Sequence, residues 1–484
     1  MAETLYDERM GDSDALTWTI ERDPLLRSTI VSVWLLDRAP DLDRARTKLE
    51  EAAQVVPRLR QRVTEDPLGV APPRWEDDPY FDLSYHLRRT GVPGKGTVRD
   101  LLDMAEPIAM QDFDRNRPLW EMTLVEGLEG GQAGVILKIH HAMSDGVGLV
   151  RMTANLIERT REPEAGAARP VKAPDAPLAE PWSPVDETLE ALRYQASRRL
   201  EQGKTTASAV MQGLSSLVRS PVESIQNVAE LAGSAGRLLA PASKPMSPIM
   251  TGRGLTRRLH TFSRPLDALK RAGKSVGGTV NDAFVAGIAG GLHRYHDAQG
   301  EGVDELRMSM PINLRHGENS RKAGNQFAPV RFAIPVGLAD PVERMEEIRR
   351  RITSERSEPS LPAMEVIAGA LNRLPAAAAT SAFGGMLKAV DFVTSNVPGP
   401  RFTVYVAGAK ILAMLPFGPA SGAATNITLF SYDGNVHIGV TSDEAAVPEG
   451  QRLVDCLEAG MDEVLATVGV ASAAAPADPK QVGA

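Results

Sequence analysis

Two stretches of alternating strand and helix patterns, separated by a proline- and alanine-rich segment, constrain the possible folds more than any other feature of this chain. The first stretch spans about 1–160 and the second about 255–470. Both mix short β-branched runs with helical spacing of apolar residues. Residues 161–184 between them are crowded with Pro, Ala and charge, which is typical of a linker or surface crossing. The pattern predicts an α/β (α+β) chain of two similar domains, each with a mixed sheet and flanking helices.

The individual elements follow from local patterns. We expect strands at 29–36, 119–125, 134–139, 306–312, 330–334, 404–407, 427–432 and 436–441, and helices at 41–56, 280–295 and 374–387. Glycine-rich residues 126–132 and the pair Asp433-Gly434 predict hairpin turns, and the two prolines at 395–400 predict a rigid loop. The expected units are an N-terminal domain at 1–160, a linker and helical crossover at 161–254, a C-terminal domain at 255–470 and a disordered tail at 471–484.

Composition excludes several classes of protein. The formal net charge of −8 is opposite in sign to that of a typical non-specific nucleic-acid binder, so no nucleic-acid partner is expected. The single cysteine, Cys456, excludes an internal disulfide and a CxxC metal site, which favours a cytoplasmic location. No apolar run is long enough to predict a membrane-spanning helix. Arg193, Arg198, Arg199 and Lys204 predict a solvated helical face or, alternatively, a contact with acidic lipid headgroups or a nucleotide phosphate.

The most informative motif is KIHHAMSDGVGLV at 138–150, in which two histidines follow a predicted strand. In an extended backbone His140 and His141 point to opposite sides, so only one can face a given cavity and the other must be held by the scaffold. No further ligands with zinc spacing lie nearby, so a metal site is not expected. Asp145 could pair with a histidine or hold the loop through an arginine, and Gly146 lets the backbone turn closely.

HHAMSDG resembles the HHxxxDG signature of the CoA-dependent acyltransferase superfamily. Further segments resemble motifs of its wax ester synthase/diacylglycerol acyltransferase branch. These are RPLWE at 117–121, TVND at 279–282, MPINLR at 310–315, SNVPGP at 395–400 and SYDG at 431–434. The resemblance covers nearly the whole chain. It implies two chloramphenicol-acetyltransferase-like domains arranged in a V around a central tunnel that both substrates reach.

The resemblance also implies roles for residues. His141 would be the general base, since an alcohol is a poor nucleophile at neutral pH and a histidine can take its proton. His140 would be structural or would shape the cavity, and Asp145 would pair with an arginine. Asn281 would be the oxyanion donor or, alternatively, a plain helix cap supported by Asp282. Arg60 would be the partner of Asp145, with Arg62 and Arg315 as alternatives. Substrate contacts would come from Pro118, Leu119, Trp120 and Asp282, or the first three would simply anchor the sheet.

The implied reaction transfers a long-chain acyl group from acyl-CoA to diacylglycerol or a long-chain alcohol. Acyl-CoA is a substrate here, and neither a cofactor nor a metal is expected. Hydrophobic substrates imply peripheral docking on the inner membrane face or a lipid droplet. Two alternatives remain open: an acyltransferase or condensation enzyme that uses a carrier-bound acyl donor for a polyketide or glycolipid, and a non-catalytic lipid-binding protein with the same fold.

Overall fold

The computed structural model describes residues 7–66, 71–144, 146–162, 190, 193–194, 244–313, 327–357, 368–369, 372 and 375–470. Most of the predicted linker and crossover, most of the basic cluster at 193–204, and the predicted tail lie outside these ranges. Among the described residues, no helix is both long enough and apolar enough to cross a membrane.

The first sheet has the strand order β4-β5-β6-β1-β13-β12-β7 and is mixed, because β4 and β5 are parallel and the other neighbours are antiparallel. Its strands are β1 (Thr29–Leu36), β4 (Leu87–Gly91), β5 (Trp120–Glu126), β6 (Ala133–His140), β7 (Ile157–Glu158), β12 (Tyr405–Val406) and β13 (Ala409–Phe417). Every residue of β6 is buried, as its nearly continuous apolar sequence predicts. A separate hairpin joins β2 (Gln61–Thr64) and β3 (Arg74–Asp77).

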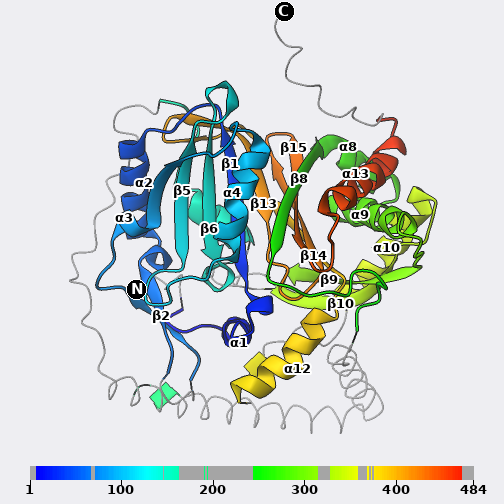
Figure 1. Ribbon diagram of the computed structural model, residues 1–484, viewed down its shortest axis with the longest axis horizontal. Helices are drawn as coiled ribbons and strands as arrows, with labels where there is room; N and C mark the ends of the chain where they lie inside the picture. Colours follow the sequence, from blue (N-terminus) through cyan, green and yellow to red (C-terminus); the bar gives the residue numbers. More distant parts are fainter. Residues whose placement is uncertain are drawn as a thin grey trace, which may run out of the picture.

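The second sheet has the order β10-β9-β11-β14-β15-β8 and is mixed as well, with β11 parallel to both of its neighbours. Its strands are β8 (Arg257–Pro265), β9 (Glu305–Asn313), β10 (Phe327–Pro335), β11 (Phe392–Pro398), β14 (Thr425–Tyr432) and β15 (Asn435–Asp443). The two sheets stand side by side in Figure 1. β13 contacts β14 and β15, so the sheets adjoin along this line.

Sheet membership does not follow chain order. Residues 405–417 lie within the range 255–470 expected for the second domain, yet β12 and β13 pair with β7 and β1 of the first sheet. The chain then returns to the second sheet in β14. This exchange fixes the two halves to each other through backbone hydrogen bonds rather than through side chains alone.

Helices cover the sheets, and some helices of one half pack against elements of the other (Figure 1). They are α1 (Asp12–Ile20), α2 (Leu42–Val55), α3 (Leu83–His86), α4 (Val98–Met110), α5 (Gly146–Thr153), α8 (Leu266–Ser275), α9 (Val280–Asp297), α10 (Pro341–Arg356), α12 (Ala376–Lys388) and α13 (Gly450–Ala466). α9 is buried and packs on α13, where a Cβ at Gly287 would lie 2.2 Å from the Met461 sulfur. α4 of the first half packs on β8 of the second, and α12 packs on α1.

The strands and helices predicted from local patterns are confirmed within one to three residues. The Asp433-Gly434 turn is also confirmed, with both residues at positive φ, as the mirror-image hairpin turns require. The rigid loop expected from Ser395 was wrong, because β11 continues to Pro398. Pro398 pairs with Ser431 of β14 as the last residue of the strand, and Pro400 follows just beyond it. The sequence patterns did not predict β8 or β13.

Candidate active site

A cavity of about 470 Å³ lies at the junction of the two sheets. Both halves of the chain line it, with α1, β1 and α5 on one side and β11, α12 and the β13–β14 loop on the other. Many lining residues are apolar, among them Leu16, Leu149, Val150 and Phe383. A cavity of this kind suits an extended hydrophobic ligand.

His141 lies where β6 ends and lines this cavity. It begins the short 3₁₀ helix η4 (His141–Met143), and its backbone N–H donates to the Ser28 carbonyl at 2.9 Å. Ser28 comes directly before β1, so the hydrogen bond continues the pairing of β6 with β1 by one position. The sheet thus fixes the backbone from which the His141 side chain reaches the cavity.

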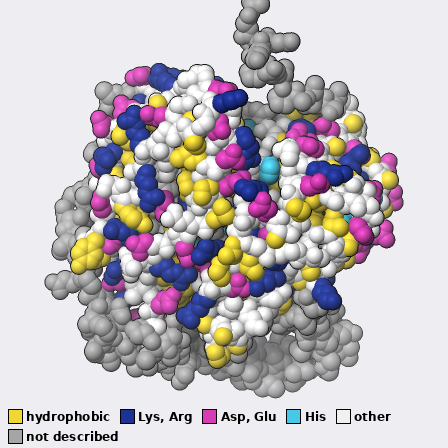
Figure 2. Space-filling model, in the orientation of Figure 1, with side chains coloured by type: hydrophobic (Ala, Val, Ile, Leu, Met, Phe, Trp, Pro, Cys, Tyr) yellow, Lys and Arg dark blue, Asp and Glu magenta, His cyan; other side chains and the backbone are white. Residues whose placement is uncertain are grey.

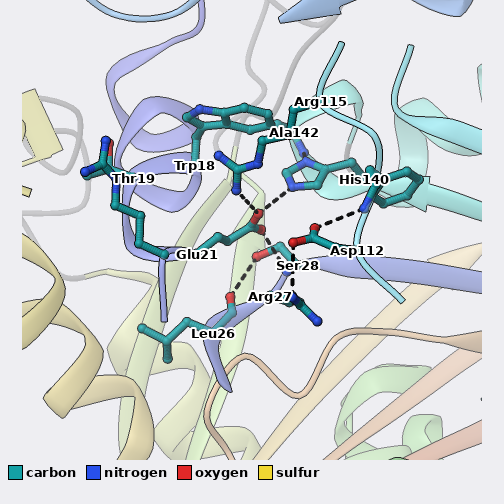
Figure 3. A network of polar contacts seen from close by, with 12 residues as sticks. Trp18, Thr19, Glu21, Leu26, Arg27, Ser28, Asp112, Arg115, His140 and Ala142 are labelled. Carbon is teal, nitrogen blue, oxygen red and sulfur yellow. Dashed lines mark hydrogen bonds and ion pairs between the residues drawn. The ribbon is translucent and has the colours of Figure 1, made fainter. Parts of the chain in front are cut away.

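His140 points to the other side of the strand and is buried. Its Nε2 lies 2.7 Å from Glu21 Oε2, and its ring packs edge-on against Trp18 (Figure 3). The Phe113 ring packs edge-on against His140 as well. One histidine therefore faces the cavity and the other is held by the scaffold, which confirms the division predicted from strand alternation.

The hydrogen bonds of His140 indicate which ring nitrogen carries the proton. The backbone N–H of Ala142 donates to Nδ1 at 3.1 Å, so Nδ1 carries no proton. The neutral ring must then hold its proton on Nε2 and donate it to Glu21. Both ring nitrogens of His140 are engaged, and this ring is not available to take a proton from a substrate.

The packed side of β6 also holds Lys138, which is fully buried beside the Phe113 ring. Its Nζ lies 3.9 Å from Glu121 Oε1, and burial lowers the pKa of this ammonium group. Charged groups therefore gather behind the strand, whereas the apolar cavity lies in front of it.

Gly146 begins α5 and lines the cavity beside β11. A Cβ at this position would lie 2.7 Å from Val397 Cγ2, so a side chain could fit only if the Val397 side chain, α5 or β11 shifted. This supports the structural role expected of the glycine. Asp145 lies outside the described residues, as does Arg315, so the pairing of Asp145 with an arginine stays a prediction.

The two other arginines considered for Asp145 are described. Arg60 follows η2 (Pro57–Leu59), and its Nε is buried with no hydrogen-bond partner among the described residues. Arg62 lies in β2, and its guanidinium is 3.7 Å from Glu76. The Arg62 Nε is likewise buried with no hydrogen-bond partner among the described residues, so both arginines stay candidates for Asp145.

Asn281 and Asp282 do not line the cavity. The Asn281 amide faces the Met310 sulfur at 3.5 Å, and its role as an oxyanion donor stays a prediction that this geometry does not support. The alternative reading as a helix cap needs a correction: Thr279 is the N-cap of α9, and Asp282 accepts from its backbone N–H at 2.7 Å in a capping box. Asp282 is thereby committed to the helix start.

Pro118, Leu119 and Trp120 do not line the cavity either. Trp120 is buried, donates from Nε1 to the Leu59 carbonyl at 2.9 Å and stacks on His86 with ring centroids 4.6 Å apart. These contacts place the segment in the core, so the structure favours the anchoring role over substrate contact.

Two residues at the site, Glu21 and Asn396, were not predicted from the sequence. Glu21 precedes His140 by 119 positions, and no local pattern connects them. Asn396 lines the cavity from β11; its place in SNVPGP was the signal that could have found it. Among the described residues, no group of three or more His, Cys, Asp or Glu side chains could hold a metal ion.

Comparison with known families agrees with this geometry. Residues 10–284 match the model of the wax ester synthase/diacylglycerol acyltransferase catalytic domain, and residues 323–464 match the C-terminal domain of the same family. The chain belongs to the wax ester synthase/diacylglycerol acyltransferase family.

Relatives and solved structures of this family extend over nearly the whole chain. A putative diacylglycerol O-acyltransferase of Mycobacterium tuberculosis H37Rv is 39% identical over 465 residues, which is 96% of this chain and 93% of the relative. A second, named probable diacylglycerol O-acyltransferase tgs2, is 31% identical over 83% of this chain and 86% of its own length.

Two solved structures share the fold. The wax ester synthase/diacylglycerol acyltransferase from Marinobacter aquaeolei VT8 superposes with a TM-score of 0.60 at 21% identity, covering 96% of this chain and 100% of that one. The first condensation domain of the calcium-dependent antibiotic synthetase gives 0.61 at 17% identity, covering 96% and 97%. Over nearly its whole length the chain therefore has the two-domain fold with mixed sheets that these structures share, as the resemblance implied.

Proposed function

We propose that this family member is an O-acyltransferase that moves a long-chain acyl group from acyl-CoA to diacylglycerol or a long-chain alcohol. The observation that carries the proposal is the placement of His141 on a largely apolar cavity, while its neighbour His140 is locked behind the strand. Family membership and the names of the relatives support the same reaction class.

His141 would act as the general base. As it takes the proton of the acceptor hydroxyl, the oxygen attacks the thioester carbonyl and forms a tetrahedral oxyanion. Collapse of this intermediate forms the ester and breaks the carbon–sulfur bond. The departing thiolate then takes the proton from the His141 imidazolium, which releases CoA and restores the neutral base. Base catalysis of this kind is typically worth about 10² to 10⁴-fold in rate.

The cavity walls would orient the two hydrophobic chains. Apolar residues from α1, α5 and α12 line the cavity and would exclude water from the thioester. Exclusion of water favours transfer to an alcohol over hydrolysis. No step requires a bound cofactor, since acyl-CoA brings the activated carbonyl.

The substitution His141→Ala tests the base assignment. With palmitoyl-CoA and either diolein or hexadecanol, we expect thiol release by the variant to fall at least about 10²-fold. His293→Ala is a matched control, because His293 is partly exposed on α9 and pairs with Asp297. If the His141 variant retains nearly full activity while the wild type is active, the base assignment is wrong.

A donor panel separates the enzyme hypotheses. Palmitoyl-CoA is compared with the same acyl group on a carrier protein, with each acceptor in turn. The proposal expects turnover with the CoA thioester, whereas exclusive use of the carrier would favour the condensation-type alternative. Binding of lipid without turnover of any donor would instead favour the non-catalytic alternative.

We also propose that the enzyme works at a lipid surface, on the inner membrane face or a lipid droplet, because diacylglycerol and long-chain alcohols have very low aqueous solubility. Flotation with vesicles that contain diolein tests this step. Recovery of the protein in the vesicle fraction is expected, and complete exclusion from vesicles that nonetheless supply substrate would contradict it.

A further inference from the structure

Glu21 sits where helix physics disfavours an acid. It is the C-cap of α1, close to the negative end of the helix dipole, and it is buried. A buried carboxylate is stable only when hydrogen bonds and charges compensate it. Its placement must therefore come from tertiary contacts.

Both hydrogen bonds of the Glu21 carboxylate lead toward the two histidines. Glu21 Oε2 accepts from His140 Nε2 at 2.7 Å, and Oε1 accepts from the Ser28 backbone N–H at 2.8 Å. The Arg115 guanidinium lies 4.0 Å from Oε2 and stacks over Trp18 (Figure 3). Each carboxylate oxygen thus has a partner of its own.

The same contacts hold both backbone neighbours of the proposed base. His140, held by Glu21, accepts from the Ala142 backbone N–H through Nδ1. Ser28, held by the other carboxylate oxygen, accepts the His141 backbone N–H through its carbonyl. One carboxylate therefore fixes residues 140, 141 and 142 in sequence, while the His141 side chain reaches the cavity on the opposite side.

We propose that Glu21 is the positioning residue for the His141 base. It acts through His140 and Ser28 rather than by touching substrate. This inference rests on the proposed function, because it assigns Glu21 to the acyl-transfer step. It extends that function because it assigns a role in positioning the base to an acid at the end of α1, far from the HHxxxDG motif in sequence.

Glu21→Gln is a sharp test because the amide cannot reproduce the network. Two donors, His140 Nε2–H and the Ser28 N–H, need two acceptors, and glutamine offers one acceptor and one donor. The other His140 tautomer would place Nδ1–H against the Ala142 N–H. At least one contact must break, and the histidine backbone is then free to shift. Misplacement of a base by about 1 Å can cost roughly 10²-fold in rate.

Glu106→Gln is the matched control. Glu106 is equally buried, on α4, and its carboxylate accepts from the Leu259 backbone N–H at 3.0 Å and from Arg99 and Arg258. We expect both variants to lower the melting temperature, but only Glu21→Gln to lower kcat, by about 10²-fold with KM little changed. Glu21→Asp keeps the charge and should recover part of kcat.

A fall in kcat no larger than that of Glu106→Gln overturns the proposal. If Glu21→Gln does not fold, Glu21→Asp is compared with Glu106→Asp by the same kinetic criterion. The wild type and His141→Ala are measured alongside: a wild type inactive with every donor counts against the proposed function, not against the network.

The tautomer of His140 provides a readout independent of activity. Ring-nitrogen chemical shifts of protein labelled with ¹⁵N-histidine should show a neutral His140 ring protonated at Nε2, and Glu21→Gln should change this signal but not that of His86. A ring protonated at Nδ1 in the wild type overturns the network itself.

Discussion

The two histidines at the end of β6 lie in contrasting surroundings on opposite sides of the strand. Behind the strand, His140 is enclosed by Glu21, Trp18 and Phe113, and both of its ring nitrogens are engaged. In front of it, His141 lines a cavity shared by both halves of the molecule. The comparison shows that residue type alone does not make a base. A histidine can act as a base only when its ring faces the reactants, and under the proposed function His140 would hold His141 in that position.

The largest effect should come from His140→Ala. Removal of this ring leaves Glu21 Oε2 without its closest partner and the Ala142 N–H without its acceptor. We expect a loss of about 3 kcal/mol in the free energy of unfolding, together with a loss of activity that approaches that of His141→Ala. Urea denaturation and thiol release measure the two effects. A stable, fully active variant would show that the contacts of His140 contribute neither to stability nor to the position of His141.

A smaller effect is expected from Gly146→Val on the cavity side. The new side chain would meet Val397, so α5 must move away from β11 and the cavity wall with it. We expect a rate loss of about tenfold or more without comparable loss of stability. Val397→Ala removes the opposing methyl groups, so the double variant should recover activity. If the second substitution restores nothing, the close approach is not what the glycine provides.

A third histidine, His437 in β15, sharpens the comparison because it is buried without an acid partner. Its Nδ1 bonds to Ser263 Oγ, its Nε2 has no hydrogen-bond partner among the described residues, and burial lowers its pKa to about 4. The unfolded chain takes up this proton near pH 6.5 and the folded chain only near 4, so stability falls as pH drops through that window.

His437→Phe should therefore flatten the pH dependence of stability between pH 6.5 and 4. The difference between the variant and the wild type should change by up to about 3 kcal/mol across this window, and should be constant above it. Urea midpoints at several pH values measure this. Parallel pH profiles for the two proteins would mean that His437 has the same pKa in the folded protein as in the unfolded chain.

The smallest effect is expected from Trp120→Phe. This variant keeps the aromatic stack on His86 but loses the hydrogen bond to the Leu59 carbonyl. We expect a loss of about 1 kcal/mol in stability and an unchanged KM for both substrates. A rise in KM with normal stability would instead restore the substrate-contact role that the PLW motif first suggested.

The surface adds one feature to this picture. On the face shown in Figure 2, acidic and basic side chains are interspersed over both halves of the molecule. This mixture is consistent with a modest net charge of −8 spread over the chain. Attraction to anionic lipid would therefore need a local cluster, and the cluster suggested by the sequence, at 193–204, lies largely outside the described residues.

The sequence by itself determined many of the local elements, the opposite orientation of His140 and His141 and the family. Strand alternation and hairpin turns depend on neighbouring residues, so they can be predicted from short windows. Tertiary structure alone decided that Glu21 holds His140, that β12 and β13 join the first sheet, and that Trp120 is buried in the core. These contacts join residues far apart in the chain or depend on which face an element buries, and no local pattern encodes either.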